Sequence, residues 1–185
     1  MKVCHMIGVD LPDGDLKESF NYTSATEDND WPTESACPGF KTTNKDFFEL
    51  CVPLHNRVLE VMAHGLNIED PLFFVKRHAQ PSRACLRSLF YPSLDDVTVK
   101  DQQVRCSEHS DYGGITMLFH QVPGLERHRV FLDGTPAERS QSRQSIVFFG
   151  NPNEEAVIDC TDNSNKYPPI TCRDYLDQKY SATHQ

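Results

Sequence analysis

The chain has 185 residues, of which 38% are hydrophobic and 24% are charged, as expected for one globular domain with an ordinary core. Its formal net charge of −9 argues against nucleic acid or an anionic membrane as a partner, because either needs a basic surface. No apolar run has the length to span a bilayer, and no signal-peptide pattern is present. The seven cysteines are dispersed, so we expect free thiols and a cytoplasmic location.

The sequence pattern of the first part of the chain predicts an irregular segment followed by helices. Residues 1–43 are rich in polar residues and proline, which is typical of loops. Apolar residues then recur every three or four positions, which predicts a helix with Asn44 as N-cap and Gly65 as C-cap. Pro53 lies inside this helix and predicts a kink or two helical pieces. A second short helix is expected to begin at Asp70.

From residue 84 the pattern changes to short strands separated by Gly, Pro and Asp. The strand-like segments are CLRSLFYP, GITMLFHQV, HRVFLDG, RQSIVFFGNP and AVIDC. Near the end, PPITCRDYLDQKY predicts one or two further helical turns. A helical first part followed by strands predicts an α+β fold whose β part is a sandwich or jelly roll.

A possible metal motif lies just before the second strand-like segment, GITMLFHQV. His109 and Asp111 are separated by one residue, so their side chains share one face of an extended segment. Gly113 and Gly114 follow and permit close approach of the backbone. Two histidines and one carboxylate can form a facial iron site, with His128 as the third ligand. The pair alone also fits a surface His and Asp at a strand end.

A second pattern lies in RQSIVFF. Here Arg143, Ser145 and Val147 alternate with residues that face the other side of the strand. An arginine on the inner face of a barrel needs an anionic partner, because a buried unpaired guanidinium is costly. A small dicarboxylate would accept the forked hydrogen bonds of the guanidinium. The alternative is an exposed strand that carries an Arg and a Ser.

The order of the motifs carries more information than each motif alone. LRSLFYP, EHSDYGGITMLF, GLE, HRV and RQSIVFFGNP, in this order, resemble the 2-oxoglutarate and iron(II)-dependent dioxygenases, specifically the isopenicillin N synthase-like group. The upstream segments DLKESF, NDWP, PGF and MAHGLNIED are similar to the same group. The resemblance extends from about residue 14 to residue 160.

The resemblance implies a site for each cofactor. It implies that His109, Asp111 and His128 bind Fe(II), and that Arg143 and Ser145 hold the distal carboxylate of 2-oxoglutarate. The implied reaction uses molecular oxygen to oxidise a small organic substrate, with hydroxylation as the expected outcome. The cosubstrate then leaves as succinate and CO₂, while the protein supplies positioning.

Two further positions can be compared with the family pattern, and one matches it while the other differs. Tyr91 matches a tyrosine that contacts 2-oxoglutarate in many members. Leu89 stands where many plant members have an asparagine, so that contact is absent. The substrate itself cannot be read from these motifs, because the same iron motif serves many chemistries.

The sequence also departs from the family pattern. Family members carry a further N-terminal segment, and several dozen residues between the GLE and HRV elements, which adjoin here at Glu126 and Arg127. We therefore expect an incomplete double-stranded β-helix. The expected regions are an irregular and helical part at 1–83, a partial jelly-roll core at 84–160, and a tail with room for a short helix at 161–185.

This departure leaves the third ligand and the activity open. A tight hairpin at Pro123 and Gly124 would hold His128 roughly 26 Å from Asp111, too far to share one metal ion. We therefore hypothesise that the isolated chain binds iron poorly. The alternative function is an inactive fragment or splice isoform with at most an interaction role.

Other histidines and one glutamate are further candidates for metal ligands. His120 and Glu126 remain alternatives for the third position. We expect ordinary core or surface roles for the histidines of the helical half, namely His55, His64 and His78.

Overall fold

The computed structural model describes residues 15–25, 29–79, 83–95, 99, 103–106, 109, 111–120, 140–162 and 164–183. These residues form helices packed on an antiparallel sheet, which confirms the predicted α+β class. None of the helices in these ranges has the length and apolar character needed to cross a bilayer.

The main sheet has four antiparallel strands in the order β1-β2-β4-β3. The strands are β1 (Glu18–Thr23), β2 (Cys85–Tyr91), β3 (Ile115–His120) and β4 (Arg143–Gly150). A separate two-stranded sheet pairs β5 (Val157–Ile158) with β6 (Ile170–Thr171). Because β1 pairs with β2, the first two predicted regions share one sheet.

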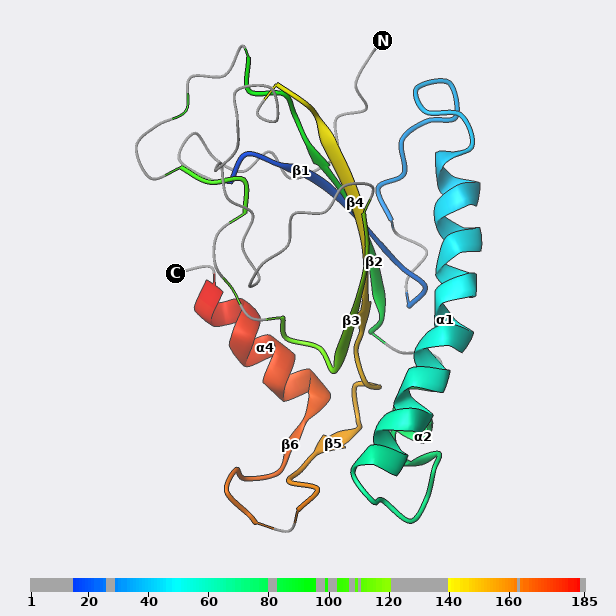
Figure 1. The fold of residues 1–185 in the computed structure, drawn as a ribbon, viewed down its shortest axis with the longest axis vertical. Helices are drawn as coiled ribbons and strands as arrows, with labels where there is room; N and C mark the ends of the chain where they lie inside the picture. Colours follow the sequence, from blue (N-terminus) through cyan, green and yellow to red (C-terminus); the bar gives the residue numbers. More distant parts are fainter. Residues whose placement is uncertain are drawn as a thin grey trace.

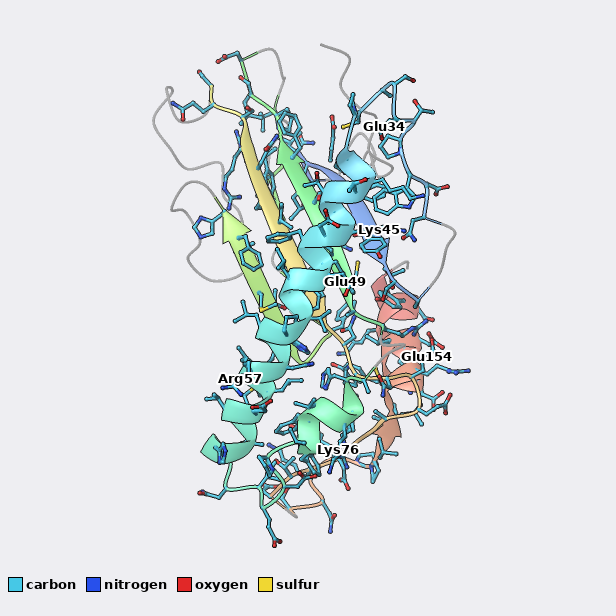
Figure 2. The ribbon with its side chains drawn as sticks, turned by 90° about the vertical axis from the view of Figure 1, so that its right-hand side faces the viewer. Glu34, Lys45, Glu49, Arg57, Lys76 and Glu154 are labelled. Carbon is cyan, nitrogen blue, oxygen red and sulfur yellow. The ribbon has the colours of Figure 1, made fainter. Side chains whose placement is uncertain are left out.

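The helices lie on both sides of this sheet (Figure 1). Helices α1 (Phe40–Gly65) and α2 (Phe73–Arg77) lie on one side, and α4 (Cys172–Thr183) lies on the other. Figure 2 shows α1 across the front of the sheet, with Lys45 and Glu49 labelled along it. The first helix thus covers one face of the sheet.

The core fills the space between α1 and the sheet. Phe48 of α1 is fully buried, with its ring centroid 5.2 Å from that of Tyr22 and 5.3 Å from that of Phe148. At the end of the sheet near β1, Trp31 packs against Phe20 with 4.9 Å between ring centroids. Aromatic side chains from the helix, two strands and a loop therefore hold α1 to the sheet.

Four predictions about the helical half need correction. Gly65 is the last residue of helix α1, so the C-cap is Leu66 and not Gly65. Helix α1 begins at Phe40, after Gly39 with φ of 73°, so Asn44 is not the N-cap. Asn44 is buried inside the helix, where its Nδ2 donates to the Phe40 carbonyl oxygen over 2.8 Å. The helix is continuous through Pro53, so it is not divided into two pieces. Helix α2 begins after the expected Asp70, whose Oδ1 accepts from the Leu72 N–H over 3.0 Å.

The strand predictions are largely confirmed. Strands β2, β3, β4 and β5 lie within four of the predicted segments. The prediction of irregular structure for residues 1–43 is wrong where β1 forms. The C-terminal helix is longer than predicted, with 12 residues. The predicted strand HRVFLDG lies outside the described residues.

Candidate functional site

The candidate site lies on the face of the sheet that points away from α1. Phe148 belongs to the core under α1, so its neighbours in β4 face the opposite side. The register places Tyr91 opposite Arg143 and Leu89 opposite Ser145. Directly paired residues point to the same face of a sheet. The predicted alternation therefore holds, and the cosubstrate candidates Arg143, Ser145 and Tyr91 share one face.

Arg143 has an unusual environment. Its two terminal guanidinium nitrogens are buried, and they have no hydrogen-bond partner among the described residues. The guanidinium carbon lies 5.1 Å from the centroid of the Tyr91 ring, which offers a weak cation–π contact only. A buried cation of this kind is unfavourable unless an anion pairs with it. The two orphaned nitrogens therefore fit a carboxylate ligand such as that of 2-oxoglutarate.

The groups around Arg143 add hydrogen-bonding capacity. Tyr91 and Ser145 are each 3% exposed. Burial raises the pKa of Tyr91. The thiol of Cys106 adds to this rise, and the charge of Arg143 opposes it. Tyr91 consequently keeps its proton at neutral pH and can donate a hydrogen bond to an anion.

The metal motif brings two of its ligand candidates together. His109 Nε2 lies 3.5 Å from Asp111 Oδ1. Bonds from such ligands to a first-row metal are about 2 Å long, so two ligands at right angles lie about 3 Å apart. The Thr116 hydroxyl donates to Asp111 Oδ2 over 2.5 Å and so orients the carboxylate. An imidazole and an oriented carboxylate at this separation fit a shared divalent metal ion.

The third ligand is not placed. His128 and Glu126 lie outside the described residues. Within the described part of the chain, no group of three or more His, Cys, Asp or Glu side chains could hold a metal ion. His120 lies four residues beyond Thr116 on β3, about 13 Å along the strand, so it is too distant to complete the pair.

The two candidate groups lie on the same face of the sheet. Thr116, which contacts Asp111, pairs with Phe149, four residues from Ser145 on β4. This spacing is about 13 Å along the strand. The His109–Asp111 pair and the Arg143 group therefore lie toward opposite ends of one face of the sheet.

Sequence reasoning missed several neighbours of these groups. Arg105 is 6% exposed, and burial together with the nearby charge of Arg143 lowers its pKa. The Cys106 sulfur lies 3.9 Å from His109 Nδ1, whereas Asp111 lies near the other ring nitrogen, Nε2. Arg105 and Cys106 lie four and three residues before His109, and this short spacing is the signal that the sequence offered.

The chain is similar to fungal oxygenases. No protein-family model matches it. It is 32% identical over 143 residues to the 2-oxoglutarate-Fe(II) type oxidoreductase ppzD of Metarhizium rileyi, covering 74% of this chain and 40% of the relative. It is 34% identical over 116 residues to the proline hydroxylase buaE of Petromyces alliaceus, covering 60% of this chain and 36% of the relative.

The fold comparison agrees with these names. A full-length Neurospora crassa protein, solved in complex with alpha-KG and thymine, matches this chain with a TM-score of 0.73 and 29% sequence identity. The similarity covers 91% of this chain and 66% of the Neurospora crassa protein. In both sequence and fold, the chain therefore resembles the 2-oxoglutarate and Fe(II)-dependent oxygenases.

The name of the ppzD relative states Fe(II) and 2-oxoglutarate, but this chain covers only part of the length of that relative. Fe(II) and 2-oxoglutarate are the cofactor and cosubstrate of the superfamily, and its members are enzymes. The chain spans about two fifths of the length of these curated relatives. The structural neighbours share the arrangement of helices on an antiparallel sheet.

Proposed function

We propose that this protein acts as an Fe(II)- and 2-oxoglutarate-dependent oxygenase of the isopenicillin N synthase-like group. It would oxidise a small organic substrate with O₂, with hydroxylation as the expected outcome, and release succinate and CO₂. The observation that carries this proposal is the buried guanidinium of Arg143, on the same sheet face as the His109–Asp111 pair. Its terminal nitrogens have no hydrogen-bond partner in the part of the chain that the structure describes. That face would be the inner face of an incomplete jelly roll.

Each residue would have a defined role. His109, Asp111 and His128 would hold Fe(II), which supplies the site for O₂ activation when bound. Arg143 would form a forked ion pair with the distal carboxylate of 2-oxoglutarate. On the same face of the sheet, Ser145 and Tyr91 would donate hydrogen bonds to that carboxylate, because both are buried beside Arg143.

The relatives support a small-molecule substrate. The Neurospora crassa protein has been crystallised with thymine and with 5-formyluracil, and buaE is named a proline hydroxylase. We infer a substrate of similar size, since the net charge of −9 disfavours nucleic acid. The dispersed cysteines support a cytoplasmic location, which remains a prediction.

Cosubstrate binding tests the proposal directly. With Mn²⁺ in place of Fe²⁺ and without O₂, we expect 2-oxoglutarate to bind, and Arg143→Ala to weaken binding about 10- to 100-fold. Arg87→Ala is the matched control. Arg87 lies on the same face of β2, but its Nε already donates to Asn21 Oδ1 over 2.7 Å, so its loss should leave affinity unchanged.

Turnover separates the active enzyme from an inactive fragment. With Fe(II), O₂ and ascorbate, the proposed enzyme releases succinate and CO₂ from 2-oxoglutarate, and this release is lost in Asp111→Ala and in His128→Ala. A chain that binds no 2-oxoglutarate and releases no succinate would be the inactive fragment or isoform. Binding without turnover would locate the defect at the metal and its third ligand.

A further inference from the structure

The turn between Asp111 and β3 is pressed against the end of β4. The Gly114 N–H donates to the Gly150 carbonyl oxygen over 3.0 Å, which extends the pairing of Ile115 with Gly150. A Cβ atom on Gly113 would lie 2.5 Å from Asn151 Oδ1 and 3.2 Å from the Gly150 oxygen. Only glycine fits this space, so the turn lies in direct contact with the backbone and side chain that follow β4.

Asn151 is itself fixed in place. It is 7% exposed, and its Nδ2 donates to the Arg83 carbonyl oxygen over 2.8 Å. A carbonyl accepts only from the nitrogen of the amide, so this bond turns Oδ1 toward Gly113. Asn151 thus joins the segment before β2 to the turn that carries Asp111.

His55 supports the same point from the side of α1. It is 4% exposed, and a Cβ on Gly150 would lie only 2.0 Å from its Nε2 atom. The His78 ring packs beside it, with 5.1 Å between ring centroids, and His78 Nε2 would lie 3.5 Å from a Cβ on Gly114. The end of β4 is therefore enclosed between the imidazole of His55 and the turn.

We propose that Asn151, with His55 behind Gly150, is a positioning residue that holds the Gly113–Gly114 turn and through it the carboxylate of Asp111. This proposal rests on the proposed role of Asp111 as a metal ligand. Asn151 acts through the turn, and Thr116 completes the placement from β3 by its hydrogen bond to Asp111. A small displacement of a ligand weakens a metal site far more than it weakens the fold.

The chain offers a closely matched control for Asn151. Asn44 is also an asparagine that is 7% exposed, and its Nδ2 donates to the Phe40 carbonyl oxygen over 2.8 Å. Its Oδ1 accepts from the Ser88 hydroxyl over 3.0 Å, under α1 and on the other face of the sheet. Alanine at either position removes the same buried amide, so the two variants should lose similar thermal stability.

Two measurements on the full chain then test the positioning role. The first is amide hydrogen exchange without metal, and the second is the Kd for Co²⁺, followed by its visible absorption with 2-oxoglutarate present. We expect Asn151→Ala to speed exchange at Gly114 and Ile115, and to raise the Kd for Co²⁺, each by at least about tenfold. Asn44→Ala should leave both values near those of the unsubstituted chain.

The outcomes separate this proposal from the proposed function. Unchanged exchange at the turn in Asn151→Ala overturns the positioning role, and so does faster exchange with an unchanged Kd for Co²⁺. A chain that binds no Co²⁺ before substitution refutes the proposed metal site instead, and exchange at the turn alone then decides whether Asn151 orders it.

A second pair of variants serves if Asn151→Ala does not fold. Gly113→Ala places a methyl group against Asn151 Oδ1, and it should weaken Co²⁺ binding. Asn151→Ser shortens the side chain that this methyl group meets, so the double variant should recover part of the Co²⁺ affinity that Gly113→Ala loses. If the two losses simply add, the contact does not position the turn.

Discussion

Arg143 illustrates a conflict between stability and function at a single residue. Its terminal nitrogens are buried without a partner among the described residues, which destabilises the chain without ligand. We expect Arg143→Met, which keeps the length and removes the charge, to raise the free energy of unfolding by about 1–3 kcal/mol without ligand.

The same substitution should remove the stabilisation that 2-oxoglutarate adds to the unsubstituted chain. Urea unfolding with and without 2-oxoglutarate measures both effects. A less stable Arg143→Met chain would show that the cation–π contact with Tyr91, or another group, already compensates the charge.

His55 gives the fold a dependence on pH. Burial, with a contribution from neighbouring His78, lowers the pKa of His55 from 6.5 to about 4. Between pH 6.5 and about pH 4, the unfolded chain therefore binds a proton on His55 that the folded chain does not bind. Stability is fully present above about pH 6.5 and falls by up to about 3 kcal/mol as the pH decreases toward 4.

Unfolding curves across this range test the role of His55. His55→Gln should flatten the decline between pH 6.5 and 4, apart from a smaller part that His78 keeps, since burial also lowers its pKa. His64→Gln, at an exposed position on the same helix, should leave the decline unchanged. An equal decline in both variants would assign the dependence to other groups.

At the scale of elements, the inner face of α1 packs on the sheet, whereas its outer face is exposed among the described residues. Phe48 is 0% exposed, whereas Leu50, two residues further along the same helix, is 69% exposed. Phe48→Ala should cost about 3–5 kcal/mol, because it leaves a cavity between the rings of Tyr22 and Phe148. Leu50→Ala should change stability by less than about 0.5 kcal/mol, as measured by urea unfolding. A comparable loss from Leu50→Ala would reveal a partner on the outer face.

The elements also show what local patterns can predict. Strand β4 agrees with its prediction, because the two-residue period of a strand is enough to predict which of its side chains share a face with Arg143. Strand β1 was missed because ESFNYT is short and lies in polar, proline-containing surroundings. It forms because Phe20 and Tyr22 reach the core under α1 once β2 supplies a hydrogen-bonding edge more than sixty residues away. Such long-range pairing leaves little local trace.

Helix α1 shows the same limit at its start. Asn44 has the chemistry of an N-cap, but the turn that ends with Gly39 at φ 73° begins the helix earlier. The site shows the same limit. The motifs predicted the pairing of His109 with Asp111, whereas Asn151 is far from Gly113 in the sequence and is its neighbour only in space.

At the scale of the whole molecule, α4 has both an ionic contact with the segment before β2 and a buried leucine. Arg83 Nε lies 3.0 Å from Glu154 Oε1, and its Nη1 lies 3.5 Å from Asp177 Oδ1 on α4. Figure 2 labels Glu154 beside this helix. Leu176 of α4 is 2% exposed. Partly exposed ion pairs contribute roughly 0–1 kcal/mol, whereas a buried leucine contributes about 2–5 kcal/mol.

We therefore expect the apolar contact to dominate the attachment of α4. Leu176→Ala should lower the free energy of unfolding by about 2–4 kcal/mol and expose α4 to limited proteolysis. Arg83→Met should cost less than about 1 kcal/mol, and 1 M NaCl should reproduce most of that loss in the unsubstituted chain. If Arg83→Met instead releases α4 to protease as fully as Leu176→Ala does, the ionic contacts with Glu154 and Asp177 hold the helix, and the packing of Leu176 depends on them.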